Sequence, residues 1–220
     1  MKKKILFCIC LVVSVAAFAQ RIQYGVGAGV TYFSIRGAAT SNLNQALNFT
    51  NGIVTTRPVA GFYSGGYATF PVTDNFSVEP GLYYSSKGYA ITGKYSVKGI
   101  DILSANATAN LNTSYIELPL LLKANFNGLL LFAGPQIAYL TSARVKTTAG
   151  LAGINLFQSS LDITSQLNKW DAAIIGGIGY QFTNGLRITA AYERGLSKVD
   201  AAQNMVSYNE GFKVGAGISF

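Results

Sequence analysis

The side chains that most often carry out catalysis are scarce in this sequence. It contains no histidine, and both cysteines, Cys8 and Cys10, lie close to the N-terminus. Histidine and cysteine are the usual members of nucleophile–base pairs and of transition-metal sites. Gly25, Gly27 and Gly29 alternate along a segment that no helix follows, so they do not form a phosphate-binding loop. The sequence therefore predicts no enzyme activity, no catalytic residue, no metal site and no cofactor.

Six ionisable residues, three acidic and three basic, lie in segments where apolar and polar residues alternate. Each falls on the polar parity of its segment, so we expect all six side chains on one side of a sheet. Charges removed from water need partners, and neighbouring segments would pair Glu79 with Lys123 and Glu193 with Lys213. We interpret the set as a structural plug, with an ion-conducting path as the alternative. The six residues are Glu79, Glu117, Lys123, Arg187, Glu193 and Lys213.

The segments that must position these charges have the pattern of strands. At the C-terminus, Phe212, Val214, Ala216, Ile218 and Phe220 share one parity, and small or polar residues occupy the other. A period of two indicates a strand with one apolar face. After residue 20, no apolar run approaches the roughly 18 residues of a membrane-spanning helix. The predicted strands are 22–35, 57–70, 76–89, 113–126, 129–140, 169–182, 186–199 and 209–220.

The connections between these strands alternate in length. Short turns follow residues 70, 126 and 182, and Asn127-Gly128 is a strong hairpin signal. Long connections such as 36–56 and 141–168 lie between them. In an outer-membrane barrel, short turns face the periplasm and long loops face outward. We therefore predict an all-β fold, an eight-stranded antiparallel up-and-down transmembrane β-barrel, located in the cell outer membrane.

Aromatic residues gather at both ends of the predicted strands. Aromatic rings with polar tips prefer the boundary between hydrocarbon and headgroups, so this clustering predicts two girdles. The girdle beside the short turns consists of Phe70, Phe76, Phe126, Phe182 and Phe220. The girdle beside the long loops includes Tyr32, Tyr84, Tyr115, Tyr139, Trp170 and Tyr192.

The first 19 residues have the plan of a secretory signal peptide. Lysines at positions 2–4 precede an apolar stretch, and Ala17-Phe18-Ala19 provides a small-residue cleavage site. We expect residues 1–19 to be removed and residues 20–220 to form one barrel domain. The net charge is +8, but no basic run occurs beyond residues 2–4. No nucleic-acid partner is therefore expected.

Three prolines lie inside predicted strands, where each removes a backbone hydrogen-bond donor. They are Pro80, Pro119 and Pro135. We expect β-bulges near them, because a bulge leaves one residue of a strand outside the ladder.

The segment 114–123 (SYIELPLLLK) resembles the outer-membrane β-barrel domain family of Bacteroidetes, which includes PorT-like and porin-like proteins. The segment 78–88 (VEPGLYYSSKG) and the pair Gly134-Pro135 are similar to this family as well. The resemblance implies an eight-stranded barrel in the outer membrane of a Bacteroidetes-like bacterium. PorT-like members are linked to protein secretion, so the resemblance also implies an alternative function as an accessory component of secretion.

Together these features predict an integral outer-membrane barrel with a structural or surface-interaction role and a lumen plugged by side chains. A narrow channel or a PorT-like secretion accessory is the alternative. The expected partners are outer-membrane lipid and, through the long outer loops, envelope or secretion proteins; the barrel is expected to be a monomer. A soluble periplasmic barrel that binds an apolar ligand is a third hypothesis. The outward Ile-Leu-Leu-Leu face of residues 116–122 argues against it.

Overall fold

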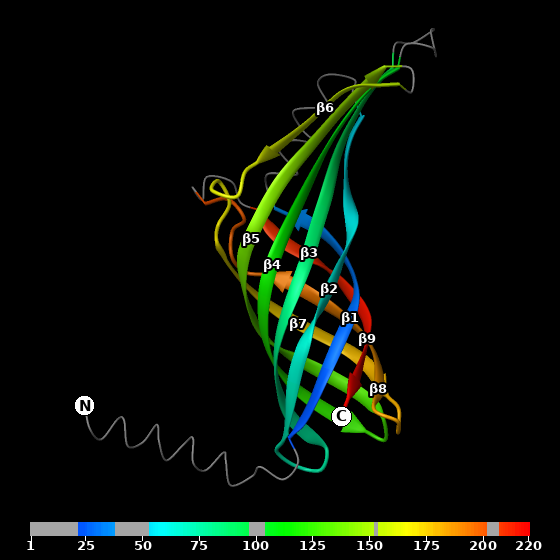
Figure 1. Ribbon diagram of the computed structural model, residues 1–220, viewed down its shortest axis with the longest axis vertical. Coiled ribbons are helices and arrows are strands. Elements are labelled where there is room, and N and C mark those ends of the chain that lie inside the picture. Colours follow the sequence, from blue (N-terminus) through cyan, green and yellow to red (C-terminus); the bar gives the residue numbers. More distant parts are fainter. Residues whose placement is uncertain (1–21, 38–52, 97–103, 152–153, 202–206) are drawn as a thin grey trace, which may run out of the picture.

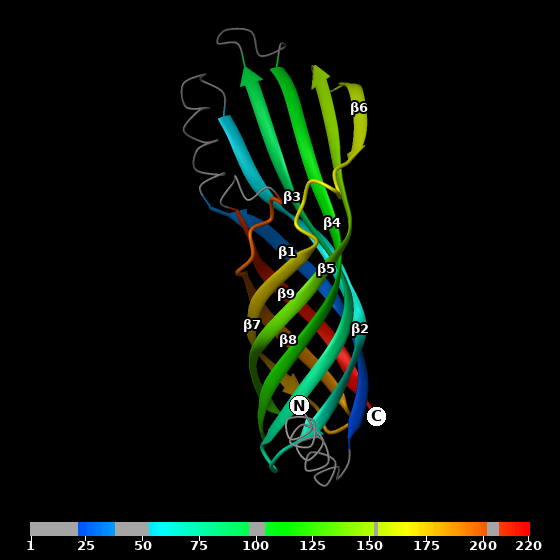
Figure 2. The ribbon, with the colours of Figure 1, turned by 90° about the vertical axis from the view of Figure 1, so that its left-hand side faces the viewer.

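The computed structural model describes residues 22–37, 53–96, 104–151, 154–201 and 207–220, so the predicted signal peptide lies outside the described residues. No helix within these ranges is long and apolar enough to cross a membrane. The described segments form nine strands in one antiparallel sheet (Figures 1 and 2). They are β1 (Gln23–Arg36), β2 (Ile53–Pro71), β3 (Phe76–Ser96), β4 (Ser104–Phe126), β5 (Leu129–Leu151), β6 (Ile154–Asp162), β7 (Trp170–Gln181), β8 (Leu186–Gly195) and β9 (Tyr208–Ser219).

Eight of these strands close into a barrel, which confirms the predicted fold class. The order around the ring is β1, β2, β3, β4, β5, β7, β8 and β9, and β9 pairs with β1 to complete it. All neighbours are antiparallel. Closure leaves no sheet edge within the ring, as lipid requires of a β structure.

The turn at Asn127-Gly128 shows how the short connections are made. Asn127 has φ of 52° and Gly128 has φ of 94°, the positive values that a tight two-residue hairpin requires. The backbone N–H of Gly128 also bonds to the side-chain oxygen of Asn125 at 2.9 Å. The predicted hairpin between β4 and β5 is therefore present.

Beyond the closed ring, part of the sheet continues outward. The pairing of β1 with β2 stops at Phe33 and Val59, whereas β2 and β3 stay paired as far as Ile53 and Lys94. The outer parts of β2, β3, β4 and β5, together with β6, form what we call the raised sheet (Figure 2). Strand β6 lies in a segment predicted to be a loop, so that prediction was wrong. Once β5 extends above the ring, a returning strand satisfies its backbone groups.

The prolines are accommodated without a bulge. The register is the same on both sides of Pro80, Pro119 and Pro135, and the shifts in the sheet lie elsewhere. Pro80 is opposite Leu120, and Pro119 is opposite Gln136, so the prolines sit close together on adjacent strands. The prediction of β-bulges near these prolines was therefore wrong. A bulge would shift the register by one residue and turn the following side chains to the other face of the sheet. A local gap in pairing instead leaves each side chain on its own face.

The exterior of the barrel is apolar between two rings of aromatic side chains. Phe76 packs edge-on against Phe126 with centroids 6.2 Å apart near the short turns. At the other end, Tyr139 packs against Trp170 at 5.0 Å. Exposed aliphatic side chains such as those of Leu118 and Ile178 occupy the wall between the rings. Such an exterior suits a lipid environment.

The predicted girdle residues lie at the expected ends of the strands, but not all of them face outward. Phe70 is half-buried. Tyr115 is only 2% exposed and belongs to an apolar cluster inside the barrel. Its assignment to the girdle beside the long loops, the outer girdle, was wrong, because Tyr115 has the same parity as the inward Glu117. The remaining girdle residues with large exposed rings are Phe76, Phe126, Phe182, Phe220, Tyr32, Tyr84, Tyr139, Trp170 and Tyr192.

Candidate functional site in the lumen

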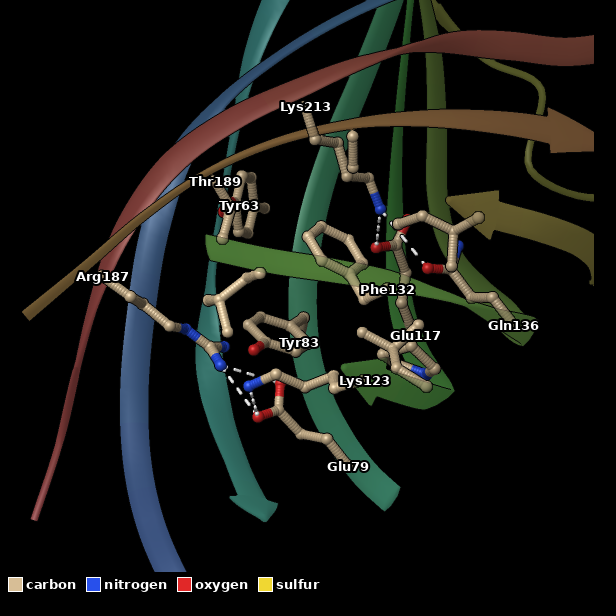
Figure 3. A pocket seen from close by; sticks show the side chains of 15 residues that line it. Tyr63, Glu79, Tyr83, Glu117, Lys123, Phe132, Gln136, Arg187, Thr189 and Lys213 are labelled. Carbon is tan, nitrogen blue, oxygen red and sulfur yellow. Dashed lines mark hydrogen bonds and ion pairs between the residues drawn. The ribbon is translucent and has the colours of Figure 1, made fainter. Parts of the chain in front are cut away.

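The lumen near the short turns contains a charged group centred on Glu79, which we call the periplasmic cluster. Lys123 donates to Glu79 at 2.6 Å, and one terminal nitrogen of Arg187 contacts both carboxylate oxygens, at 2.9 and 2.8 Å (Figure 3). The Thr69 hydroxyl adds a bond of 2.6 Å. The guanidinium of Arg187 also lies 3.5 Å from the centroid of the Tyr67 ring. Strands β2, β3, β4 and β8 are therefore tied together across the lumen.

A second group, the outer cluster, lies farther along the lumen and alternates cations with anions. The Nζ of Lys213 is 2.5 Å from Glu117 and 2.7 Å from Glu193. The Nζ of Lys87 is 2.8 Å from Glu117 and also contacts Glu193. Lys87 additionally lies 4.5 Å from the centroid of the Phe33 ring. Two cations and two anions therefore satisfy one another in a site that water hardly reaches.

A cavity lies between the two clusters, and residues of both line it. Its volume is about 70 Å³, and it is lined by charged side chains at its ends and by apolar ones such as Leu130, Phe132 and Ile175. A space of this size holds only a few water molecules. Gln136 accepts a bond from Lys213 at 3.4 Å, and its amide nitrogen is buried without a protein partner. That nitrogen is positioned to bind such a water.

Above the outer cluster, apolar side chains pack together near the mouth of the barrel, and we call this group the apolar cap. Leu111, Tyr115, Leu140 and neighbouring alanines form a buried cluster on the inward faces of β4 and β5. Ile163 and Leu167, which follow β6, pack against it. Apart from the cavity between the two clusters, buried side chains therefore line the lumen from the periplasmic cluster to this apolar cap.

All six residues predicted for the lumen are buried inside the barrel: Glu79, Glu117, Lys123, Arg187, Glu193 and Lys213. The two pairs expected from adjacent segments, Glu79 with Lys123 and Glu193 with Lys213, are in contact. The structure adds Lys87, which was not among the residues predicted for the lumen. Lys87 is eight positions from Glu79 on the same strand, so its even spacing was a usable signal.

Asp171 and Gln136 are two further buried polar residues that were not predicted to lie in the lumen. Asn209 donates to Asp171 at 2.7 Å. Asp171 follows the outward-facing Trp170, so its parity also indicated the interior. In the described segments, no three metal-binding side chains come close enough to hold an ion. The charges of the lumen chiefly bind one another.

An antiparallel ring with an apolar exterior, aromatic belts and a charged interior defines a transmembrane β-barrel. The chain belongs to the outer membrane protein beta-barrel domain family, whose model matches residues 18–201. The protein is accordingly located in the outer membrane. The match concerns the barrel domain as a whole and does not single out the PorT-like members. No curated protein matches the chain.

Several solved barrels are similar to this chain over most of its length. The attachment invasion locus protein Ail of Yersinia pestis is 14% identical, with a TM-score of 0.45, over 91% of this chain and 100% of that one. Neisserial surface protein A is 11% identical, with a TM-score of 0.47, over 90% and 97%. OprG of Pseudomonas aeruginosa is 13% identical, with a TM-score of 0.43, over 90% and 96%.

Proposed function

We propose that the protein is a non-catalytic outer-membrane barrel with a sealed lumen, which acts as a structural and surface-interaction component of the cell envelope. The observation that supports this function is the filled interior. The periplasmic cluster, the outer cluster and the apolar cap follow one another along the lumen. An eight-stranded barrel is just wide enough for such a filling of side chains.

The contacts of the lumen carboxylates argue against catalysis by them. Glu79 accepts hydrogen bonds from Thr69, Lys123 and Arg187, and Glu117 and Glu193 are each engaged by two lysines. A general base needs an oxygen within reach of a substrate proton. These carboxylates are instead buried among fixed cations, an arrangement suited to a structural role.

The raised sheet supports the surface-interaction part of the proposal. It projects beyond the ring on the side of the outer girdle (Figure 1). Among the described strands, β6 pairs only with β5, so its other edge carries backbone groups available to an added strand. Phe157 and Leu161 on β6 are 57% and 61% exposed. An exposed edge with apolar side chains is a suitable contact surface for another protein.

A deletion strain tests this function against its alternative. If the barrel is structural, cells that lack it secrete their normal set of proteins and take up small solutes at the wild-type rate. A variant that lacks β6 and has a short turn after β5 is then expressed in the deletion strain. It should restore envelope integrity, but it should not pull down a partner protein from intact envelopes. Loss of protein secretion in the deletion strain, restored by the full-length chain, would instead support the PorT-like alternative. Loss of small-solute uptake would support a narrow channel.

A further inference from the structure

Basic side chains lie on the outside of the barrel directly beyond the outer aromatic girdle. On β1, Arg36 follows the girdle residue Tyr32 on the same outward parity, and on β8 Arg194 follows Tyr192. On β5, exposed basic residues follow Tyr139 after a shift of register. We call these residues the basic band. It consists of Arg36, Arg144, Lys146 and Arg194.

This band occurs at only one end of the described barrel. Near the short turns, Lys123 and Arg187 point into the lumen and contact Glu79. In the segments that the structure covers, Asp74 is the only charged residue outside the lumen at that end. Lipid headgroups are present on both sides of a membrane, so attraction to headgroups in general does not by itself confine basic residues to one end. The asymmetry indicates recognition of an anionic group that is present on the outer side.

Part of the band is built into a defined arrangement around Glu210 on β9. Glu210 is opposite Arg194 in the ladder, and its carboxylate is 3.2 Å from the Nε of Arg36. Tyr192 donates to the same oxygen of Glu210 at 3.1 Å. The guanidinium of Arg36 also lies 5.1 Å from the centroid of the Tyr208 ring. One acid thus contacts Arg36 and lies opposite a second arginine across the ladder, and the group of two arginines and one glutamate keeps a net positive charge.

The wall below these arginines is suited to acyl chains. Tyr192 packs against Phe212 with centroids 5.2 Å apart. Val214 and Ile218 continue the exposed apolar face along β9, beside Val30 of β1. A lipid whose headgroup contacts the arginines would lay its chains against this face. Arginine forms forked hydrogen bonds that match the oxygens of a phosphate group.

We propose that the outward face of β1, β8 and β9 binds a phosphate-bearing lipid of the outer leaflet, with Arg36 and Arg194 as the ligands of its phosphate. Glu210 is the positioning residue that holds Arg36. The site depends on the placement of the barrel in the outer membrane and is independent of the proposed sealing of the lumen.

The test uses the full barrel in three kinds of vesicle: phosphatidylcholine alone, phosphatidylcholine with bis-phosphorylated lipid A, and phosphatidylcholine with dephosphorylated lipid A. Native mass spectrometry after extraction measures the retained lipid. We expect retention of the bis-phosphorylated lipid A, and of neither dephosphorylated lipid A nor phosphatidylcholine, because the phosphate of phosphatidylcholine is neutralised by its own choline group. The double variant Arg36→Gln/Arg194→Gln should bind it roughly thirtyfold more weakly, from the usual contribution of two basic residues at an anionic surface.

Two comparisons make the result decisive. The double variant Arg144→Gln/Lys146→Gln removes the same charge from another part of the band, and an equal loss of binding would overturn a built site in favour of diffuse attraction. Arg36→Lys/Arg194→Lys keeps the charge and should retain part of the affinity.

Equal retention of dephosphorylated lipid A would also overturn the proposal. Displacement of the bound lipid by inorganic phosphate at similar concentration would show that free phosphate, not a lipid headgroup, is the ligand.

Discussion

Replacing Glu79 by glutamine should destabilise the barrel by about 3 kcal/mol, because it leaves two buried cations without an acid. The carboxylate accepts bonds of 2.6 to 2.9 Å from Lys123, Arg187 and Thr69, and all these partners are buried. Removing one member of a buried ion pair costs about 3–5 kcal/mol. Glutamine keeps the shape and one acceptor oxygen, so we expect the lower end of this range.

The assay is unfolding by guanidinium in lipid vesicles, followed by the fluorescence of the single tryptophan, Trp170. The double variant Glu79→Gln/Lys123→Met restores the original net charge of the periplasmic cluster. It should therefore recover about 1–3 kcal/mol of the loss, as expected for directly interacting residues. Asp74→Asn, in an exposed turn, is the matched control and should change the unfolding free energy by less than about 0.5 kcal/mol. A cost below about 1 kcal/mol for Glu79→Gln, or no recovery in the double variant, would refute unpaired buried charge as the cause.

Three further changes test the wall, the strand packing and the raised sheet. Leu118→Arg places a charge on the lipid face and should cost about 2–4 kcal/mol in the same unfolding assay; a neutral effect would contradict lipid contact there. Gly29→Val should sharply reduce the refolded yield on heat-modifiability gels, because an added Cβ would lie 2.2 Å from a backbone oxygen of β9. Gly66→Ala, whose nearest contact is 3.5 Å, should refold normally, and equal yields would count against the packing argument. Side-chain and backbone hydrogen bonds from Thr164 hold the pKa of Asp162 below its ordinary value of 3.8. The stability that these bonds give the folded state is therefore fully present above the unfolded pKa, and it is lost as the pH falls through the lower folded pKa. Thr164→Val removes the side-chain bond and keeps the backbone bond, so it should raise the carboxyl pKa in an NMR titration; an unchanged value would rule out the side-chain bond as a cause.

The faces of the barrel strands could be predicted because lipid imposes a strict rule on them. Outward positions within the membrane must be apolar, so an ionisable residue on the other parity is assigned to the lumen. The same reasoning paired Glu79 with Lys123, which lie on adjacent strands. The parity of Lys87 also indicated the lumen, although Lys87 was not predicted there. Tyr115 lies near a strand end, as girdle residues do, but its parity directs its ring inward.

Contacts across the lumen could not be predicted in the same way. Lys87 meets Glu193 across the barrel, from a strand that is not its neighbour. Such a contact depends on the height of each residue along the barrel axis, which the tilt and stagger of all eight strands determine together. Alternation along one strand carries no information about that stagger.

The raised sheet was missed for a different reason. Outside the membrane, a strand has no lipid face, so its outward positions need not be apolar. Residues 154–162 (INLFQSSLD) mix apolar and polar residues without a clean period of two. Their strand conformation depends on pairing with the extended β5, a tertiary effect that local sequence does not specify.

The most direct test of the sealed lumen is electrical recording from the purified barrel in a planar lipid bilayer. We predict no stable open-channel steps from the wild-type protein, because the periplasmic cluster, the outer cluster and the apolar cap fill the interior. Insertion is verified in parallel by heat-modifiable migration of protein recovered from the same lipid. Reproducible unitary steps from wild-type barrels, altered in size by Glu117→Gln, would show that ions pass the outer cluster and would contradict the sealed lumen.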